Sequence, residues 1–198
     1  MAEFYGGCDV GSATGKAVVI DAAGSPVAKV LIPSRIDPEE TARIVTEEAC
    51  SQAGVEGGAG GLAYLVGTGY GRNEVPFANE NISEITCHAV GAHSCEPGVR
   101  TIVDIGGQDA KAVSVNEDGT VREFAMNDKC AAGTGRFYEA MGRTFGMSLE
   151  EFSGLSLEAR RVLPVTSQCS VFAETEVISL LAKRNPAADV AAGIQAAV

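Results

Sequence analysis

Residues 8–24 read CDVGSATGKAVVIDAAG, and residues 103–119 read VDIGGQDAKAVSVNEDG. Aligning Asp9 with Asp104 also superimposes the glycine two residues later, the following lysine and the final glycine of each stretch. Each copy predicts a strand, a glycine-rich turn, a second strand, a second turn and a third strand. Because Asp, Gly, Lys and the turn coincide at one spacing, an internal duplication explains the pattern better than chance.

The chemistry of this repeated unit suits phosphate binding. The glycines after each aspartate let backbone N–H groups approach phosphate oxygens, and two such hairpins facing each other would grip a polyphosphate from both sides. We expect Asp9 and Asp104 to hold a hydrated magnesium ion and Gln108 to orient an attacking water; these three are the predicted catalytic residues. The predicted nucleotide contacts in the hairpins are Gly11, Ser12, Thr14, Lys16, Gly106, Gly107, Gln108 and Asp109. Either copy alone would also be compatible with an ordinary hairpin that carries exposed turn acids.

The composition argues against several classes of partner. The formal net charge is −11, aromatic residues make up 6% of the 198 residues and Trp is absent, so a nucleic-acid surface is not expected. No apolar run reaches the roughly 18 residues of a membrane span, and the first residues lack the basic region of a secretion signal. We therefore expect a cytoplasmic protein with no membrane partner, whose six cysteines are thiols, metal ligands or redox groups.

The rest of the chain is predicted to be α/β. Asp37 and Pro38 form a typical helix start, as N-cap and N1 residues, and we expect a helix from there to about Gln52. Further elements are predicted as a strand over 62–66 and as helices from Ser83, over 131–145, over 172–183 and after Pro186. With the repeat, they predict a duplicated actin-like (ribonuclease H-like) ATPase fold of mixed sheets flanked by helices, with lobes at residues 1–95 and 96–198.

Two cysteines, Cys130 and Cys169, each stand where the pattern predicts the start of a helix. A helix N-terminus stabilises anions and so favours the thiolate, which is the form that binds metal. Two thiolates cannot complete a four-thiolate cluster, but two copies of the chain sharing one cluster could. On spacing alone, two buried thiols or a reactive pair remain alternatives. Cys87 and His88, with His93 and Cys95, have the residue types of a zinc site. The spacing of Cys87, His88 and Cys95 along one predicted helix instead favours helix packing and partner contacts.

Six stretches follow one another along the chain: DVGS at 9–12, GTGYGR at 67–72, SEITCH at 83–88, DIGGQD at 104–109, MNDKCAAGTGRF at 126–137 and VFAETEVIS at 171–179. Together they closely resemble the activator (component A) of 2-hydroxyacyl-CoA dehydratases. That family also includes the ATPase subunits of benzoyl-CoA reductase. The stretches around Cys130 and Cys169 are the most specific, because actin-like kinases share the hairpins without them.

The resemblance implies a homodimer that holds one 4Fe–4S cluster at the subunit interface, with Cys130 and Cys169 of each chain as ligands. It also implies that binding of ATP and its hydrolysis to ADP drive single electrons from reduced ferredoxin or flavodoxin through the cluster to the dehydratase, under anaerobic conditions. A helix that passes the phosphate cleft at Gly133, Thr134 and Gly135 would then let the state of the γ-phosphate move the helix and change the surroundings of the cluster.

Family members continue beyond the position of Val198 into a Gly-Gly-containing stretch that helps bind adenosine, so we expect a chain that is truncated at its C-terminus. The alternative functions are an ATPase subunit of a benzoyl-CoA reductase-type enzyme, an actin-like small-molecule (sugar) kinase and a non-catalytic nucleotide sensor. A kinase would be colourless and insensitive to Cys130→Ser. A sensor would bind nucleotide without turning it over.

Overall fold

The computed structural model describes residues 3–127, 133–166 and 169–197. The chain divides into two compact units, which are a first unit of residues 1–102 and 113–123 and a second unit of residues 103–112 and 124–198. Among the described residues, no helix has the length and apolar character needed to cross a lipid bilayer.

The first unit is built on a five-stranded mixed sheet. Its strands are β1 (Phe4–Val10), β2 (Thr14–Asp21), β3 (Pro26–Pro33), β4 (Tyr64–Thr68) and β5 (Glu80–Asn81), in the order β3-β2-β1-β4-β5. The central strand β1 pairs with β2 in antiparallel and with β4 in parallel orientation, which places Asp9 opposite Lys16 on one side and Thr68 on the other. The first aspartate of the repeat therefore lies near the C-terminal end of the central strand, between β2 and β4.

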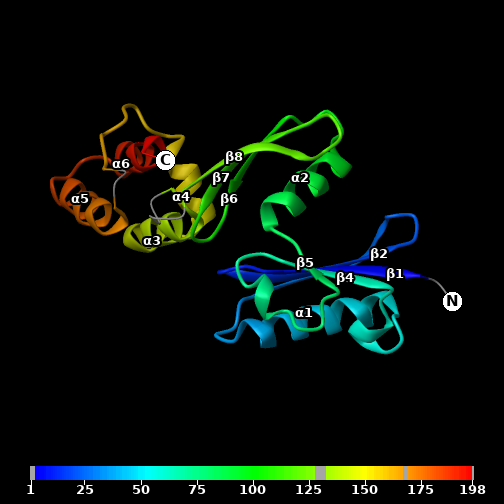
Figure 1. Ribbon diagram of the computed structural model, residues 1–198. Helices are drawn as coiled ribbons and strands as arrows, with labels where there is room; N and C mark the ends of the chain where they lie inside the picture. The colour runs from blue at the N-terminus through cyan, green and yellow to red at the C-terminus, as the bar shows by residue number, and fades with distance from the viewer. Residues whose placement is uncertain (1–2, 128–132, 167–168, 198) are drawn as a thin grey trace. The chain divides into compact units, whose positions relative to one another are not determined.

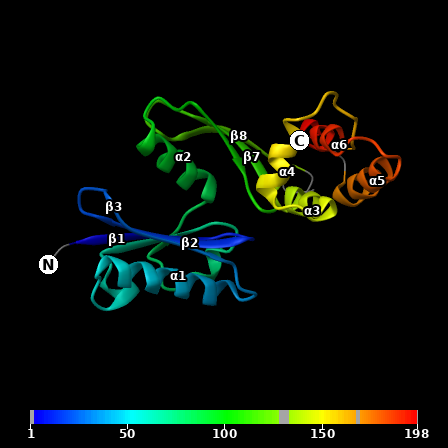
Figure 2. The same ribbon diagram turned by 180° about the vertical axis from the view of Figure 1, so that it is seen from behind.

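Helix α1 (Pro38–Ala53) covers one face of this sheet (Figures 1 and 2). Its start is the predicted one, because the side chain of Asp37 accepts a first-turn amide at 3.0 Å, and Gly54 ends the helix at a φ of 70°. Cys8 and Val10 of β1 are buried in the same core as the inner face of α1. Since side chains alternate along a strand, Asp9 points to the opposite face of the sheet.

A second sheet of three strands holds the second copy of the repeat. Its strands are β6 (Thr101–Ile105), β7 (Ala110–Val115) and β8 (Val121–Asn127), in the order β6-β7-β8. Helix α2 (Glu84–Cys95) shares a small core with β7, formed by Ile85 and Ala89 of the helix and Val113 and Val115 of the strand.

The hairpins after the two phosphate turns have matching geometry, as a duplication requires. Gly24 and Gly119 both lie in the left-handed region, with φ of 81° and 83°. Each donates its amide to the carbonyl three residues earlier, Gly24 to Asp21 at 2.9 Å and Gly119 to Asn116 at 3.1 Å. The prediction of a duplicated α/β fold is confirmed.

Four helices of the second unit pack around one core. They are α3 (Gly135–Phe145), α4 (Leu149–Ser156), α5 (Ser170–Ala182) and α6 (Ala187–Ala196). The core consists of buried residues from all four helices, namely Phe137, Met141, Phe152, Ala173, Val177, Val190, Ala191 and Ile194. Because α3 follows the Cys130 stretch and α5 follows Cys169, the two cysteine-bearing stretches lead into helices that share a single core.

The sequence prediction missed α4, although Ser148 and Glu151 form a capping box at its start. The strand predicted over 62–66 begins two residues later, because Leu62 instead ends the short 3₁₀ helix Gly58–Gly61. A second 3₁₀ helix spans Arg72–Glu74.

Candidate functional site

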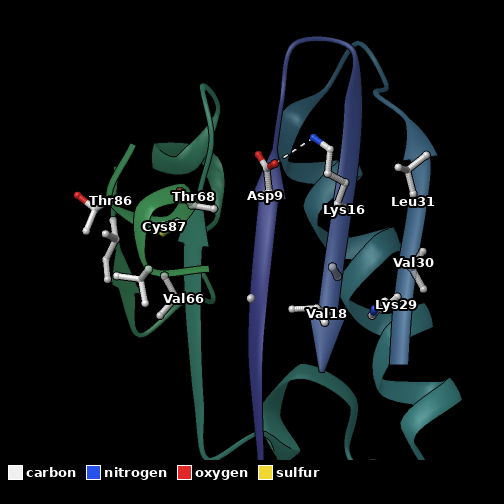
Figure 3. A pocket seen from close by; sticks show the side chains of 14 residues that line it. Asp9, Lys16, Val18, Lys29, Val30, Leu31, Val66, Thr68, Thr86 and Cys87 are labelled. Carbon is white, nitrogen blue, oxygen red and sulfur yellow. Dashed lines mark hydrogen bonds and ion pairs between the residues drawn. The ribbon is translucent and has the colours of Figure 1, made fainter. Parts of the chain in front are cut away.

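The first glycine turn is closed by its own backbone and carries an ion pair. The amide of Gly11 donates to the carbonyl of Thr14 at 3.0 Å, and the ammonium of Lys16 lies 2.9 Å from Oδ2 of Asp9 (Figure 3). Lys16 also donates to the carbonyl of Thr14 at 3.3 Å. A Cβ on Gly11 would stand 2.9 Å from that same carbonyl, so the turn has room only for glycine. Ser12 lies within this turn.

The second glycine turn repeats this geometry at the aligned positions. The amide of Gly106 donates to the carbonyl of Asp109 at 2.9 Å. The ammonium of Lys111 lies 3.6 Å from Oδ2 of Asp104 and 2.7 Å from Oδ1 of Asp109. Gly107 and the exposed Gln108 form the tip of the turn. The sequence alignment of the two hairpins is thus matched by equivalent hydrogen bonds and equivalent Asp–Lys pairs.

The two lysines differ in burial. The side chain of Lys111 is 3% exposed, whereas that of Lys16 is 42% exposed. The aspartates are alike, since Asp9 is 23% exposed and Asp104 is 24% exposed. Lys16 can therefore reach a ligand, while Lys111 is placed to hold the carboxylates of its own turn in position.

The Asp9–Lys16 pair opens onto a cavity of about 660 Å³ over the sheet face opposite α1 (Figure 3). Apolar side chains such as Val18 and Leu31 line this cavity from the sheet, and Cys87 lines it from α2. The two charged side chains of the first turn thus stand beside open space rather than inside the core.

The loop after β4 braces the first turn, and sequence reasoning did not predict this. The amide of Gly71 donates to the carbonyl of Val10 at 2.8 Å. Gly69 has a φ of 91°, and a Cβ there would overlap Oδ1 of Asp9. Ser34 braces the turn from another side, because its hydroxyl donates to the carbonyl of Gly11 at 2.7 Å. The closely spaced glycines at 67–71 were the available signal for this close approach.

The second glycine turn is hydrogen-bonded to the start of α3. The amide of Gly135 donates to the carbonyl of Gly106 at 2.8 Å, and the amide of Arg136 donates to the carbonyl of Gly107 at 3.1 Å. Thr134, directly before α3, is fully buried, and Gly133 lies in the left-handed region with a φ of 85°. The predicted residues Gly133, Thr134 and Gly135 are therefore brought next to the predicted phosphate turn.

Of the two candidate cluster ligands, Cys130 lies outside the described residues. Cys169 is the half-buried N-cap residue of α5, and its side chain makes no capping hydrogen bond. Within the described ranges there is no group of three or more His, Cys, Asp or Glu side chains that could hold a metal ion.

Two other cysteines are core residues. Cys8 and Cys50 are both fully buried, and this burial raises the pKa of each thiol. Cys87 is half-buried and Cys95 is exposed, both on α2. Cys8 is therefore a small core residue of the first unit.

Comparison with known proteins identifies the relatives of this chain. Residues 7–198 match the model of the BadF/BadG/BcrA/BcrD ATPase family. The chain is 43% identical over 175 residues to the activator of lactoyl-CoA dehydratase from Anaerotignum propionicum, a match that covers 88% of this chain and 66% of that protein.

Two solved structures resemble the chain closely. Component A of (R)-2-hydroxyglutaryl-CoA dehydratase from Acidaminococcus fermentans has a TM-score of 0.89 at 36% identity, over 98% of this chain and 74% of that one. The ADPNP-bound activator of 2-hydroxyisocaproyl-CoA dehydratase from Clostridium difficile has a TM-score of 0.87 at 37% identity, and the match covers 100% of this chain and 72% of that one. The chain thus spans 66–74% of the length of these three proteins. With its paired Asp–Lys glycine turns, the chain belongs to the BadF/BadG/BcrA/BcrD ATPase family and has the actin-like fold of the dehydratase activators.

Proposed function

We propose that the protein is an ATP-hydrolysing activator of a 2-hydroxyacyl-CoA dehydratase, to which it passes single electrons from a reduced ferredoxin or flavodoxin. The observation that carries this proposal is the pair of hydrogen bonds from Gly135 and Arg136 to the carbonyls of Gly106 and Gly107. These bonds join a phosphate-type turn to the helix that follows Cys130. The similarity to three dehydratase activators, one with bound ADPNP, supports the same function.

The glycine turns fit a polyphosphate. The ammonium of Lys16, which is 42% exposed, would contact a phosphate, and the tight backbone at Gly11 and Gly106 lets main-chain groups approach its oxygens. Asp9 and Asp104 would hold magnesium through water. Gln108, exposed at the tip of the second turn, would orient the attacking water. Hydrolysis of ATP and release of inorganic phosphate would then take away the γ-phosphate and leave the diphosphate of ADP.

The cysteines fit a cluster shared between two chains. Cys169 and Cys130 of each copy would supply four thiolates to one 4Fe–4S cluster on a two-fold axis, so the working protein would be a homodimer. When bound, the cluster supplies one-electron transfer. The side chains next to Cys169 include the exposed Val171 and Phe172, which suit burial in such a dimer.

Coupling between nucleotide and cluster would run through α3. A shift of the Gly106–Gly107 backbone on loss of the γ-phosphate would be transmitted to the first turn of α3 through the bonds of 2.8 and 3.1 Å. The chain leading into that turn carries Cys130. The environment of the cluster, and with it the reduction potential, would therefore follow the state of the nucleotide.

Anaerobic reconstitution with iron and sulfide tests this proposal. We expect a brown protein with about four iron atoms per dimer and an ATPase activity that depends on magnesium. Cys169→Ala should abolish iron uptake, whereas Cys95→Ala, at an exposed position on α2, should leave it unchanged. A colourless protein that still hydrolyses ATP would instead support the kinase-type alternative, and a cluster that survives Cys169→Ala would refute the ligand assignment.

A further inference from the structure

The segment that leads to Cys169 has little secondary structure of its own. Residues 159–166 connect the end of α4 to the Cys169 stretch without a helix or strand. Backbone amides in such a segment lack ladder or helix partners and need acceptors from elsewhere. In this chain, carboxylates on the two following helices supply several of those acceptors.

The upstream part of the segment is fastened to α6. Asp189, whose side chain is 5% exposed, accepts the amides of Arg160 at 3.0 Å and Arg161 at 3.3 Å. It also accepts Nε of Arg161 at 2.9 Å. Gly193 lies directly under Leu163, since a Cβ on Gly193 would overlap the carbonyl of Leu163. The segment is thus held against α6 by a buried carboxylate and by close backbone contact.

The downstream part is fastened to α5, the helix that Cys169 itself begins. Oε2 of Glu176 accepts the amide of Thr166 at 2.8 Å. Glu176 lies two helical turns below Cys169, and side chains on a helix point back toward its N-terminus. Only three peptide units separate Thr166 from Cys169, so the fastened amide can lie no more than about 11 Å from that of the cysteine. Because α5 holds the preceding segment through Glu176, we expect it to restrain the position of Cys169 at its start.

The neighbouring carboxylate has a different role. Oε1 of Glu174 accepts the hydroxyl of Thr144 on α3 at 3.2 Å, and Glu174 is exposed. Glu174 and Glu176 both lie in the VFAETEVIS stretch at 171–179, but their carboxylates have different partners. In the structure, one carboxylate links two helices and the other holds the backbone that leads to Cys169.

We propose that Glu176 is a positioning residue for Cys169, which holds the cysteine thiol in place for the shared cluster by anchoring the amide of Thr166. This inference rests on the proposed function for its purpose. The bond itself, a carboxylate that accepts a backbone N–H, is of the charge-assisted class, which is stronger than a neutral hydrogen bond. Its loss should free the approach segment without removing any ligand.

Three variants separate this role from a general loss of stability. Glu176→Leu removes the acceptor, Glu176→Gln keeps a neutral acceptor at the same reach, and Glu174→Leu is the matched control on the same helix. In the metal-free chain, we expect Glu176→Leu to speed hydrogen exchange of the Thr166 amide about tenfold, and iodoacetamide alkylation of Cys169 by a similar factor, because both react from a locally opened state. In Glu176→Gln and Glu174→Leu, both the exchange rate and the alkylation rate should stay within about threefold of the parent chain. If Glu176→Leu does not fold, Glu176→Asp shortens the reach while keeping the charge.

The reconstituted protein gives a second readout. The electron paramagnetic resonance spectrum of the reduced cluster should change in Glu176→Leu and return in Glu176→Gln. An unchanged spectrum in Glu176→Leu would overturn the positioning role. So would an exchange rate of the Thr166 amide and an alkylation rate of Cys169 that both stay within about twofold of the parent chain in Glu176→Leu, or an equal effect of Glu174→Leu. A parent chain that takes up no iron would refute the proposed function instead, since the exchange and alkylation measurements do not require a cluster.

Discussion

Lys111 and Lys16 occupy equivalent positions of the two repeats, yet they should contribute very differently to stability. The test is to replace each lysine with methionine, which keeps most of the aliphatic stem and removes the charge. At Lys111 the change takes a 3%-exposed cation away from Asp109 and Asp104, which lie 2.7 and 3.6 Å from its ammonium. At Lys16 it breaks one ion pair of a side chain that is 42% exposed.

The expected magnitudes follow from burial. Removing one partner of a buried ion pair costs roughly 3–5 kcal/mol, because the remaining charge loses its compensation. Asp104 and Asp109 are each 24% exposed, so water offsets part of the penalty and we expect a value near the lower limit, about 3 kcal/mol. An exposed pair is worth about 0–1 kcal/mol, which is the expectation for Lys16→Met.

Urea unfolding followed by circular dichroism measures both values. The free energy of unfolding should fall by about 3 kcal/mol in Lys111→Met and by less than about 1 kcal/mol in Lys16→Met, at a similar slope against urea. Adding salt should reduce the small Lys16 effect further and leave most of the Lys111 effect. Equal losses in the two variants would show that burial of Lys111 does not govern its contribution, and the reasoning would fail.

Three further predictions concern a carboxylate, a thiol and a glycine. The pKa of Asp189 is lowered, chiefly by a backbone hydrogen bond, so its carboxylate stabilises the fold at pH values above the unfolded pKa of about 3.9, and this contribution is lost as the pH falls through the lower folded pKa. The melting temperature of Asp189→Asn should therefore lie below that of the parent chain at pH 7 and approach it near pH 3. A difference in melting temperature that does not change with pH would contradict this. Burial raises the pKa of the Cys8 thiol, so iodoacetamide at pH 8 should label the exposed Cys95 and leave Cys8 unlabelled in the folded chain. Peptide mass spectrometry measures both labelling rates, and equal rates would contradict the buried position of Cys8. Gly69→Ala places a Cβ against the carboxylate of Asp9 at a φ of 91° and should lower the free energy of unfolding by about 2–4 kcal/mol. The control Gly24→Ala, where the space is open, should lower it by about 1 kcal/mol. Equal losses in the two variants would show that the contact with the first turn is unimportant.

Local signals carried much of the prediction. The duplication, the two glycine turns and the start of α1 at Asp37 were all predictable, because turns and caps depend on residues close together in the sequence. The predicted α5 and α6 are found within two residues of their expected starts. The capping box at Ser148 and Glu151 was a signal of the same kind, and α4 could have been predicted from it.

The brace around the first turn could not be predicted from local pattern. Gly69 and Gly71 meet Asp9 and Val10 only because β4 pairs in parallel with β1, and a parallel pairing joins residues that are far apart in the sequence. The assignment of roles to the predicted nucleotide and cluster residues stays a prediction. What the structure adds is their surroundings, such as the bonds from the second turn to Gly135.

The sequence by itself determined that this protein has two copies of an Asp–Gly–Lys hairpin and two cysteines at predicted helix starts, because these are features of residue type and spacing. Only the tertiary structure decided which lysine is buried and what Glu176 contacts. Lys16 and Lys111 occupy aligned positions of the two hairpins but differ in exposure, which depends on what packs around each side chain. For the same reason, Glu174 and Glu176 lie two residues apart and hold different parts of the second unit.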